Sequence, residues 1–176
     1  SGYVAPDSVS VKKEEKVTYL PKDYLKKVEE QTSKQNFETP DLNSKKVDIM
    51  GKPIVLFPPV NGILTSKFDI EDHYAIDLAA KANEPIKAIA DGYVIFSEYS
   101  VENGYMIAIA HSENIISIYK HNSKVFKKTG SFVYVGEPIA VVGNTGENST
   151  GPHLHFELWI QGKPVNPLDY FTYVEK

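Results

Sequence analysis

The sequence is organised around the stretch Gly143-Asn-Thr-Gly-Glu-Asn-Ser-Thr-Gly-Pro-His-Leu-His-Phe-Glu-Leu-Trp-Ile160. Its first half is rich in Gly, Asn, Ser and Thr and its second half in Leu, Phe, Trp and Ile, which predicts a turn leading into a buried strand. His153 and His155 are two residues apart, so they share one face of that strand. Two imidazoles side by side, with no acid beside them on that face, favour different partners, for instance a metal ion for one and a reacting group for the other.

Upstream of this stretch, short apolar runs separated by Gly, Pro and Asn extend back to about residue 47. Many short strands at this spacing, with hardly a helical period, predict a mainly β fold with a compact antiparallel β-sheet. Isoleucines at alternate positions in two runs, 107–109 and 116–118, lead us to expect one packed and one wet sheet face. The predicted strands are Ile54–Phe57, Ile63–Phe68, Pro85–Ala90, Tyr93–Tyr99, Tyr105–His111, Ile115–Tyr119, Ile139–Val142 and His153–Ile160.

The first 46 residues have a different texture. Residues 1–17 are polar with little to bury, Pro21–Gln35 has the pattern of a short amphipathic helix, and residues 37–46 resemble a linker. We therefore expect an N-terminal arm over residues 1–46 and a β domain over residues 47–176. The arm could lie over a functional groove as a self-inhibitory segment, or bind an envelope protein or another copy of the chain.

Composition excludes several classes of function. The 176 residues carry a formal net charge of -4 with no basic block, so the charge does not favour binding to nucleic acid or to an anionic membrane. Cysteine is absent, so any metal must be held by histidine and carboxylate groups. No apolar run approaches the ~18 residues that a membrane-spanning helix needs. We expect an export signal or anchor to have been removed ahead of Ser1.

A second cluster of polar residues supplies possible partners for the paired histidines. His73 and Asp77 are four residues apart, and with one histidine of the pair they would make a His/Asp/His zinc set with one tetrahedral position open to water. Hydrolysis requires such a position, because bound zinc lowers the pKa of water from ~15.7 toward ~7. Four residues of straight strand span ~13 Å, so the segment from His73 to Asp77 must bend or form a helix. Both remain open, although a loop turning into a strand fits the surrounding β pattern better.

Each of these residues also has a plain structural interpretation. Alone, His73 and Asp77 would be an exposed helical pair, and His121 an ordinary histidine at a strand end. His111 has no companion and is expected to be structural or exposed. Together, however, these residues favour a functional site, because four of the five histidines lie in three sequence motifs that recur together in one protein family.

The motifs resemble those of the M23, or LytM-like, zinc metallopeptidases, which include the lysostaphin-type peptidoglycan endopeptidases. The resemblance covers roughly residues 58–171, and its last block is highly specific. The matching motifs, in order, are Thr65-Ser-Lys-Phe68, His73 to Asp77, Pro85-Ile-Lys-Ala-Ile-Ala-Asp-Gly-Tyr-Val94, Tyr119-Lys-His121, Gly130 to Ile139, Gly143 to Gly146 and Ser149 to Glu157.

The resemblance implies a role for each matching position. His73, Asp77 and His155 correspond to the family's zinc ligands, and His121 and His153 to the two histidines that assist catalysis. It also implies a compact, mostly antiparallel β domain with the site in a groove, one zinc ion per chain and peptidoglycan peptides as substrates. The expected location is the bacterial cell envelope, periplasmic or extracellular.

Two departures from the family pattern concern the groove. Ala75 stands where the family usually has glycine, so the bend must be made with negative φ or with strain of order 1 kcal/mol. The segment between Phe68 and His73 is short, which would open the groove.

The leading hypothesis is a zinc-dependent endopeptidase that hydrolyses peptidoglycan stems or cross-bridges. The alternative is a catalytically silent LytM-like scaffold that binds and regulates a cell-wall amidase or other envelope protein.

Overall fold

The structure is a computed structural model that describes residue 54 and residues 56–171. The predicted arm over residues 1–46, with its helix and linker, lies outside the described residues. Within the described part, no helix has the length and apolar character needed to cross a membrane.

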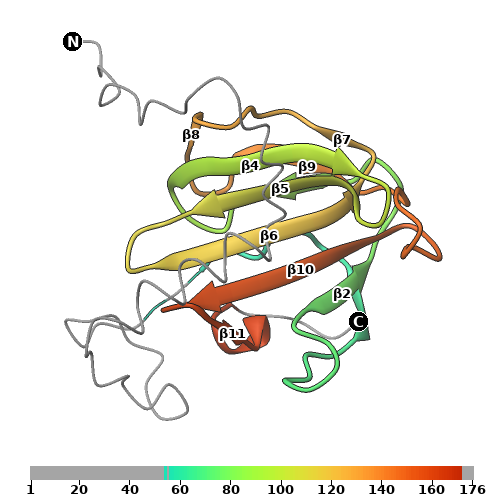
Figure 1. Ribbon diagram of the computed structural model, residues 1–176, viewed down its shortest axis with the longest axis horizontal. Coiled ribbons are helices and arrows are strands. Elements are labelled where there is room, and N and C mark those ends of the chain that lie inside the picture. Colours follow the sequence, from blue (N-terminus) through green and yellow to red (C-terminus); the bar gives the residue numbers. More distant parts are fainter. Residues whose placement is uncertain (1–53, 55, 172–176) are drawn as a thin grey trace, which may run out of the picture.

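The β domain is built on two antiparallel sheets (Figure 1). The large, eight-stranded sheet has the order β1-β2-β10-β6-β5-β4-β8, and β11 pairs with β10; the small sheet has the order β3-β9-β7. All neighbouring strands in both sheets run antiparallel, so the predicted mainly β, antiparallel fold is confirmed. The elements are β1 (Ile63–Ser66), β2 (Ile76–Ala79), β3 (Pro85–Lys87), β4 (Gly92–Ser100), β5 (Gly104–Ala110), β6 (Ile115–Asn122), β7 (Lys124–Val125), β8 (Phe132–Val133), β9 (Pro138–Val141), β10 (His153–Ile160), β11 (Lys163–Val165) and a short 3-10 helix, η1 (Pro167–Asp169).

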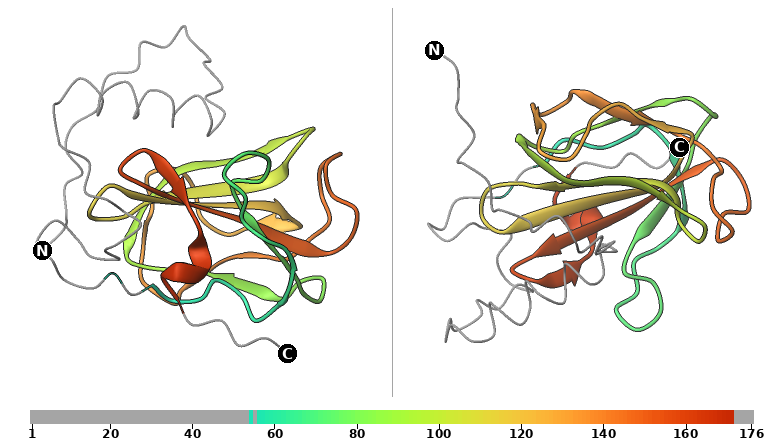
Figure 2. Two further views of the ribbon diagram at one scale, coloured as in Figure 1. Left: turned by 90° about the horizontal axis from the view of Figure 1, so that it is seen from below. Right: turned by 45° about the horizontal axis from the view of Figure 1, so that its top comes forward.

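The main hydrophobic core lies between the two sheets (Figure 2). Ile86 and Ile139 from the small sheet join Tyr119, Leu154 and Phe156 from the large one, and all five are essentially inaccessible to solvent. Burial of a side chain of this size stabilises the fold by about 1.5–3 kcal/mol. Tyr170 and Phe171, after η1, belong to the same core.

One face of the sheet was expected to be exposed to solvent, but a second cluster of buried apolar side chains lies on it. Met106, Ala108, Ile116, Ile118 and Trp159 form it on β5, β6 and β10. They alternate along their strands with members of the main core, so they lie on the opposite face. Every residue of β6 is buried, and the strands at the centre of the large sheet carry apolar side chains on both faces.

The prediction of a strand over Ile54–Phe57 is wrong, because the described residues of that segment (54, 56 and 57) belong to no strand. The N–H of Leu56 donates to the carbonyl oxygen of Tyr170 and that of Phe57 to Ile89, so the two neighbours pair with different segments. Pro58 and Pro59 follow and have no N–H to donate, which prevents a continuous ladder.

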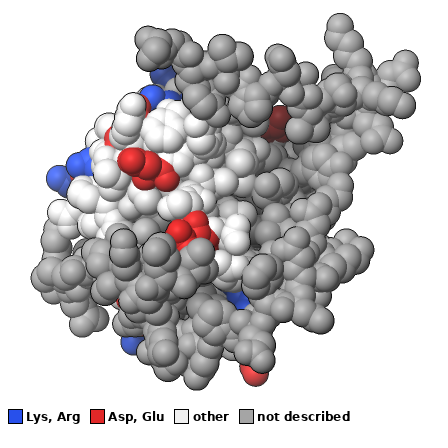
Figure 3. All heavy atoms as spheres, turned by 90° about the vertical axis from the view of Figure 1, so that its left-hand side faces the viewer, with Lys and Arg blue, Asp and Glu red and all other residues white. Residues whose placement is uncertain are grey.

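The described surface carries both acidic and basic side chains. Figure 3 shows the side of the molecule that faces left in Figure 1, where, among the residues that are not grey, acidic side chains lie within an uncharged area and basic side chains lie toward its edge.

Candidate functional site

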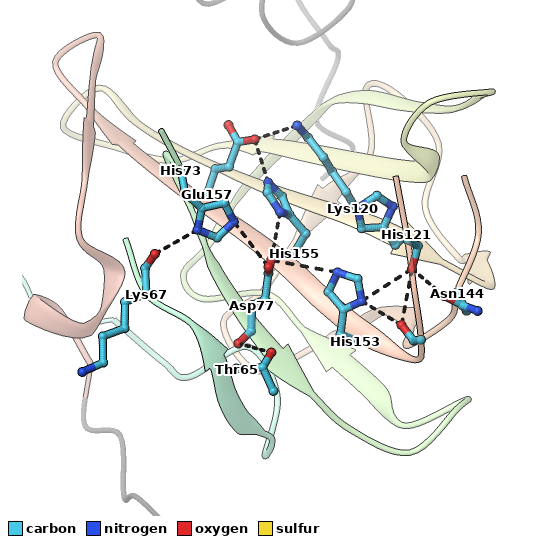
Figure 4. A network of polar contacts seen from close by, with 12 residues as sticks. Thr65, Lys67, His73, Asp77, Lys120, His121, Asn144, His153, His155 and Glu157 are labelled. Carbon is cyan, nitrogen blue, oxygen red and sulfur yellow. Dashed lines mark hydrogen bonds and ion pairs between the residues drawn. The ribbon is translucent and has the colours of Figure 1, made fainter. Parts of the chain in front are cut away.

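The site is assembled where three neighbouring strands of the large sheet meet. In the ladder between β10 and β2, His155 lies opposite Asp77 and His153 lies opposite Ala79. On its other side β10 pairs with β6, where His155 lies opposite Lys120. Cross-strand neighbours have Cβ atoms about 4.5–5.5 Å apart, so the register alone brings side chains from distant parts of the sequence into contact (Figure 4).

A bend places His73 beside Asp77. His73 forms an isolated bridge with Asp69, residues 74 and 75 turn, and β2 begins at Ile76. The segment is therefore a loop leading into a strand and not a helix. Ala75 is fully buried, and it is absent from the non-glycine residues with positive φ in the described chain, so the bend avoids the left-handed region.

His73, Asp77 and His155 each offer one ligand atom, and these atoms all lie within 4.8 Å of one another. The His73 Nε2 atom is 3.3 Å from Asp77 Oδ2, and the His155 Nδ1 atom is 2.9 Å from Asp77 Oδ1. Zinc bonds of ~2.0–2.2 Å to nitrogen and oxygen give tetrahedral edges of roughly 3.3–3.6 Å. The donor set and its spacing therefore fit a zinc ion after small movements of the side chains.

Hydrogen bonds determine which ring nitrogen each histidine presents. The His73 Nδ1–H donates to the carbonyl oxygen of Lys67 over 2.9 Å, because a carbonyl can only accept. This leaves the lone pair of His73 Nε2 facing Asp77. His155 contacts carboxylates through both nitrogens, Asp77 through Nδ1 and Glu157 through Nε2 over 3.1 Å.

The local charges follow from these contacts. Burial alone would lower the pKa of His155, but its hydrogen bonds with Asp77 and Glu157 outweigh this effect and raise the pKa. Burial would raise the pKa of Asp77, yet the hydrogen bond with His155 and the nearby imidazoles hold it below its ordinary value. An ionised Asp77 carboxylate beside the nitrogens of two imidazoles is well suited to a divalent cation.

His121 and His153 complete the cluster and lie beside the candidate metal-binding triad. Their ring centroids are 5.0 Å apart, and the ring of His121 lies 5.7 Å from that of His155. His153 donates through Nδ1 to the carbonyl of Gly151 over 2.8 Å, and its Nε2 atom is 3.9 Å from Asp77 Oδ1. His121 donates through Nδ1 to the carbonyl of Thr145 over 2.9 Å. In the neutral tautomer that these contacts require, the ring proton of each residue is on Nδ1.

Burial lowers the pKa of His121 to about 4, so this imidazole is neutral at pH 7. Its backbone has a φ of 66°, an unfavourable value for a residue with a side chain. Thr145 supports this conformation, since its hydroxyl donates to the carbonyl of Asn122 over 2.6 Å and accepts from the N–H of Tyr105. Strain of order 1–3 kcal/mol is commonly held at functional sites in this way.

Two residues of the site were not identified from the sequence. Glu157 lies on the same face of β10 as His155, which corrects the expectation of a face without an acid, and the alternation of the strand was the available signal. Lys120 forms an ion pair with Glu157 over 2.6 Å. No sequence signal indicated Lys120, because its position depends on the register between β6 and β10. His111 lies outside the site and contacts the Asp91 carbonyl and the Ser117 hydroxyl.

Comparison with known proteins identifies similar chains. The chain is 40% identical over 100 residues to an uncharacterized metalloprotease of Buchnera aphidicola, covering 57% of this chain and 26% of that one. It is 42% identical over 96 residues to the DD-carboxypeptidase/endopeptidase Mpg of Neisseria meningitidis (54% and 22% covered). It is 35% identical over 115 residues to the murein hydrolase activator NlpD of Salmonella dublin (64% and 30% covered). The chain thus spans less than a third of each of these relatives.

Solved structures share the fold. A candidate M23 peptidase from Pseudomonas aeruginosa matches with a TM-score of 0.62 and 31% identity, over 87% of this chain and 62% of that one. A zinc-containing peptidase from Vibrio cholerae matches with a TM-score of 0.59 and 28% identity, over 68% of this chain and 42% of that one. The model of peptidase family M23 matches residues 71–167, more than half of the chain and the whole cluster of four histidines and Asp77. The chain belongs to peptidase family M23.

Proposed function

We propose that this protein is a zinc-dependent endopeptidase that hydrolyses peptide bonds in the stems or cross-bridges of peptidoglycan. The observation that carries the proposal is the cluster in which the atoms of a His/Asp/His triad lie within 4.8 Å of one another beside two further imidazoles. The similarity to a DD-carboxypeptidase/endopeptidase and to a zinc-containing peptidase supports both the reaction and the metal.

In this proposal the triad holds the ion through His73 Nε2, an Asp77 carboxylate oxygen and His155 Nδ1. Catalytic zinc sites typically have three protein ligands and a further position for water or substrate, so this donor set would suit hydrolysis. A zinc ion bound there would act as a Lewis acid that polarises the scissile carbonyl and acidifies water.

His121 and His153 carry the proton transfers. Their Nδ1 protons are engaged by backbone carbonyls, which leaves Nε2 of each neutral ring available for a proton, and both rings lie beside the triad. One of them accepts a proton from the attacking water, and the other donates a hydrogen bond to the developing oxyanion or protonates the leaving amine. The geometry supports either assignment of the two roles.

A second candidate function is a scaffold that regulates a cell-wall hydrolase. The similarity to a murein hydrolase activator favours it. The intact His/Asp/His set and both additional histidines favour catalysis. Both candidates require contact with peptidoglycan or its enzymes, so we propose that the protein works in the bacterial cell envelope.

Replacement of single histidines distinguishes the two functions. We expect the purified protein to contain zinc and to release peptides from isolated cell walls. His155→Ala should lose the metal and the activity, whereas His153→Ala should keep the metal and lose about 10²–10⁴-fold in turnover. His111→Ala, outside the site, is the matched control and should keep both. A zinc-loaded wild type that leaves cell walls intact but stimulates a purified amidase would support the scaffold.

A further inference from the structure

Glu157 is the buried acidic residue nearest to His155 on β10. The residue is only 4% exposed, and its Oε1 atom lies 3.1 Å from His155 Nε2. The other nitrogen of His155 faces Asp77. Glu157 therefore contacts the back of the imidazole, away from the candidate metal position (Figure 4).

Two further side chains hold the Glu157 carboxylate. The Nζ atom of Lys120 on β6 lies 2.6 Å from Oε1, and the indole N–H of Trp159 donates to Oε2 over 2.9 Å. Lys120 and Trp159 are only 6% and 7% exposed. Both carboxylate oxygens thus have partners from buried side chains, and rotation of the carboxylate would break at least one of these contacts.

We propose that Glu157 is a positioning residue for the metal centre. By accepting a hydrogen bond from His155 Nε2–H, it fixes the tautomer and the ring orientation that direct the Nδ1 lone pair toward Asp77 and His73. Lys120 and Trp159 keep the carboxylate in that position. The proposal rests on the proposed function only in requiring that the triad bind zinc.

The ion pair with Lys120 also balances the charge around the site. A buried ammonium group next to the metal ligands would repel a divalent cation, and Glu157 lies between Lys120 and His155 and neutralises it. Loss of Glu157 therefore has two consequences, a free imidazole and an unpaired buried cation. The two can be separated by first replacing the lysine.

The experiment measures zinc affinity of the full chain by competition with a chromogenic chelator. Lys120→Met keeps the contact between Glu157 and His155 and should bind zinc at least as tightly as wild type. In that background, Glu157→Leu should weaken zinc binding by about 10–100-fold. Glu157→Gln, whose amide oxygen can still accept from His155, should recover most of the affinity. The visible spectrum of the Co²⁺-loaded Leu variant should shift, and that of the Gln variant should stay close to wild type.

A second Lys–Glu ion pair among the described residues provides a matched control. Lys127 and Glu137 form it on a more exposed part of the domain, so Glu137→Gln should leave zinc affinity unchanged. Thermal unfolding of each variant verifies that it is folded, and the Lys120→Met background is used so that Glu157→Leu leaves no unpaired buried charge. Equal zinc affinity and equal Co²⁺ spectra in the Leu, Gln and Lys120→Met proteins would overturn the positioning role.

This outcome is distinguishable from failure of the proposed function. A wild type that binds zinc but does not cleave cell walls contradicts the proposed peptidase activity, while the series of Glu157 variants still decides the positioning role. A wild type that cleaves cell walls with no dependence of zinc affinity on residue 157 contradicts only the positioning role.

Discussion

At the scale of single residues, each histidine of the site has one ring nitrogen held by a protein oxygen from outside the His73, Asp77 and His155 triad. Backbone carbonyls take the Nδ1 protons of His73, His121 and His153, whereas His155 uses Nε2 toward the Glu157 carboxylate. Three imidazoles therefore present Nε2 and one presents Nδ1. A side chain, unlike a carbonyl, can be replaced, so His155 is the proposed ligand whose orientation can be changed by mutation of its partner.

The fifth histidine gives a prediction for stability. Burial lowers the pKa of His111, partly offset by hydrogen bonding to the Asp91 backbone. Between that lowered value and the unfolded pKa of ~6.5, the unfolded chain binds more protons, so His111 makes the fold less stable as the pH falls. In His111→Gln we expect the free energy of unfolding to decrease less steeply from pH 7 to pH 5 than in wild type.

Urea unfolding at several pH values, with a chelator present so that metal release does not contribute, measures this slope. The other titratable groups are common to both proteins, so the difference between the two slopes reports on residue 111. Identical slopes in wild type and His111→Gln would show that protonation of this side chain is not linked to unfolding.

The site shows how far reasoning from single residues reaches. His73 and Asp77 could be paired from their spacing, and His153 and His155 from strand alternation. The same alternation places Glu157 on their face, but its importance depends on Lys120 and Trp159, and the partnership with Lys120 requires the register of two strands far apart in sequence. The motif that resembles the family, Ser149 to Glu157, includes Glu157 but does not indicate which residues this side chain contacts.

At the scale of elements, strands with long apolar runs were predictable and short ones were not. The predictions for β4, β5, β6 and β10 agree with the structure within a few residues. The two-residue strands β7 and β8 carry too little pattern to be recognised. For β2, sequence left strand and helix open, since Ile76–Ala79 contains good helix formers and only pairing with β1 and β10 selects the strand.

The turn between β4 and β5 yields a prediction about His121. Gly104 has a φ of +67°, and a Cβ built there would lie 2.0 Å from the Thr145 hydroxyl oxygen and 2.5 Å from the Thr145 carbonyl. Since Thr145 holds His121, we expect Gly104→Ala to displace this contact. The variant should lose both turnover and stability, the latter by more than the ~1–2 kcal/mol cost of a left-handed alanine.

Gly130 offers a matched control for this variant. Its φ is +89°, but a Cβ there would have nothing within 4 Å. Gly130→Ala should therefore show the backbone cost in urea unfolding and normal hydrolysis of cell walls. Equal turnover of the two alanine variants would contradict a link from Gly104 through Thr145 to His121.

At the scale of the whole molecule, the folded unit extends beyond the part that matches the family. The family model covers residues 71–167, whereas the main core also includes Leu56 and Val60 before it and Tyr170 and Phe171 after it. Backbone hydrogen bonds join the two ends, from Leu56 to Tyr170, and tie Lys87 to Pro59. The segments outside the family match thus complete the core around the shared sheet.

Truncation tests both this unit and the expected arm. We expect a fragment of residues 47–176 to unfold in a single cooperative transition, because it contains every residue of both core clusters. A fragment of residues 71–167 lacks four core side chains, each worth about 1.5–3 kcal/mol, and should be largely unfolded, given that whole domains are stable by only ~5–15 kcal/mol. Circular dichroism during urea titration measures both transitions, and equal midpoints would contradict a role for the flanking segments.

The 47–176 fragment also tests whether the N-terminal arm inhibits the protein. If residues 1–46 are self-inhibitory, the fragment should hydrolyse cell walls faster than the full chain does. Equal turnover of the fragment and the full chain would exclude self-inhibition.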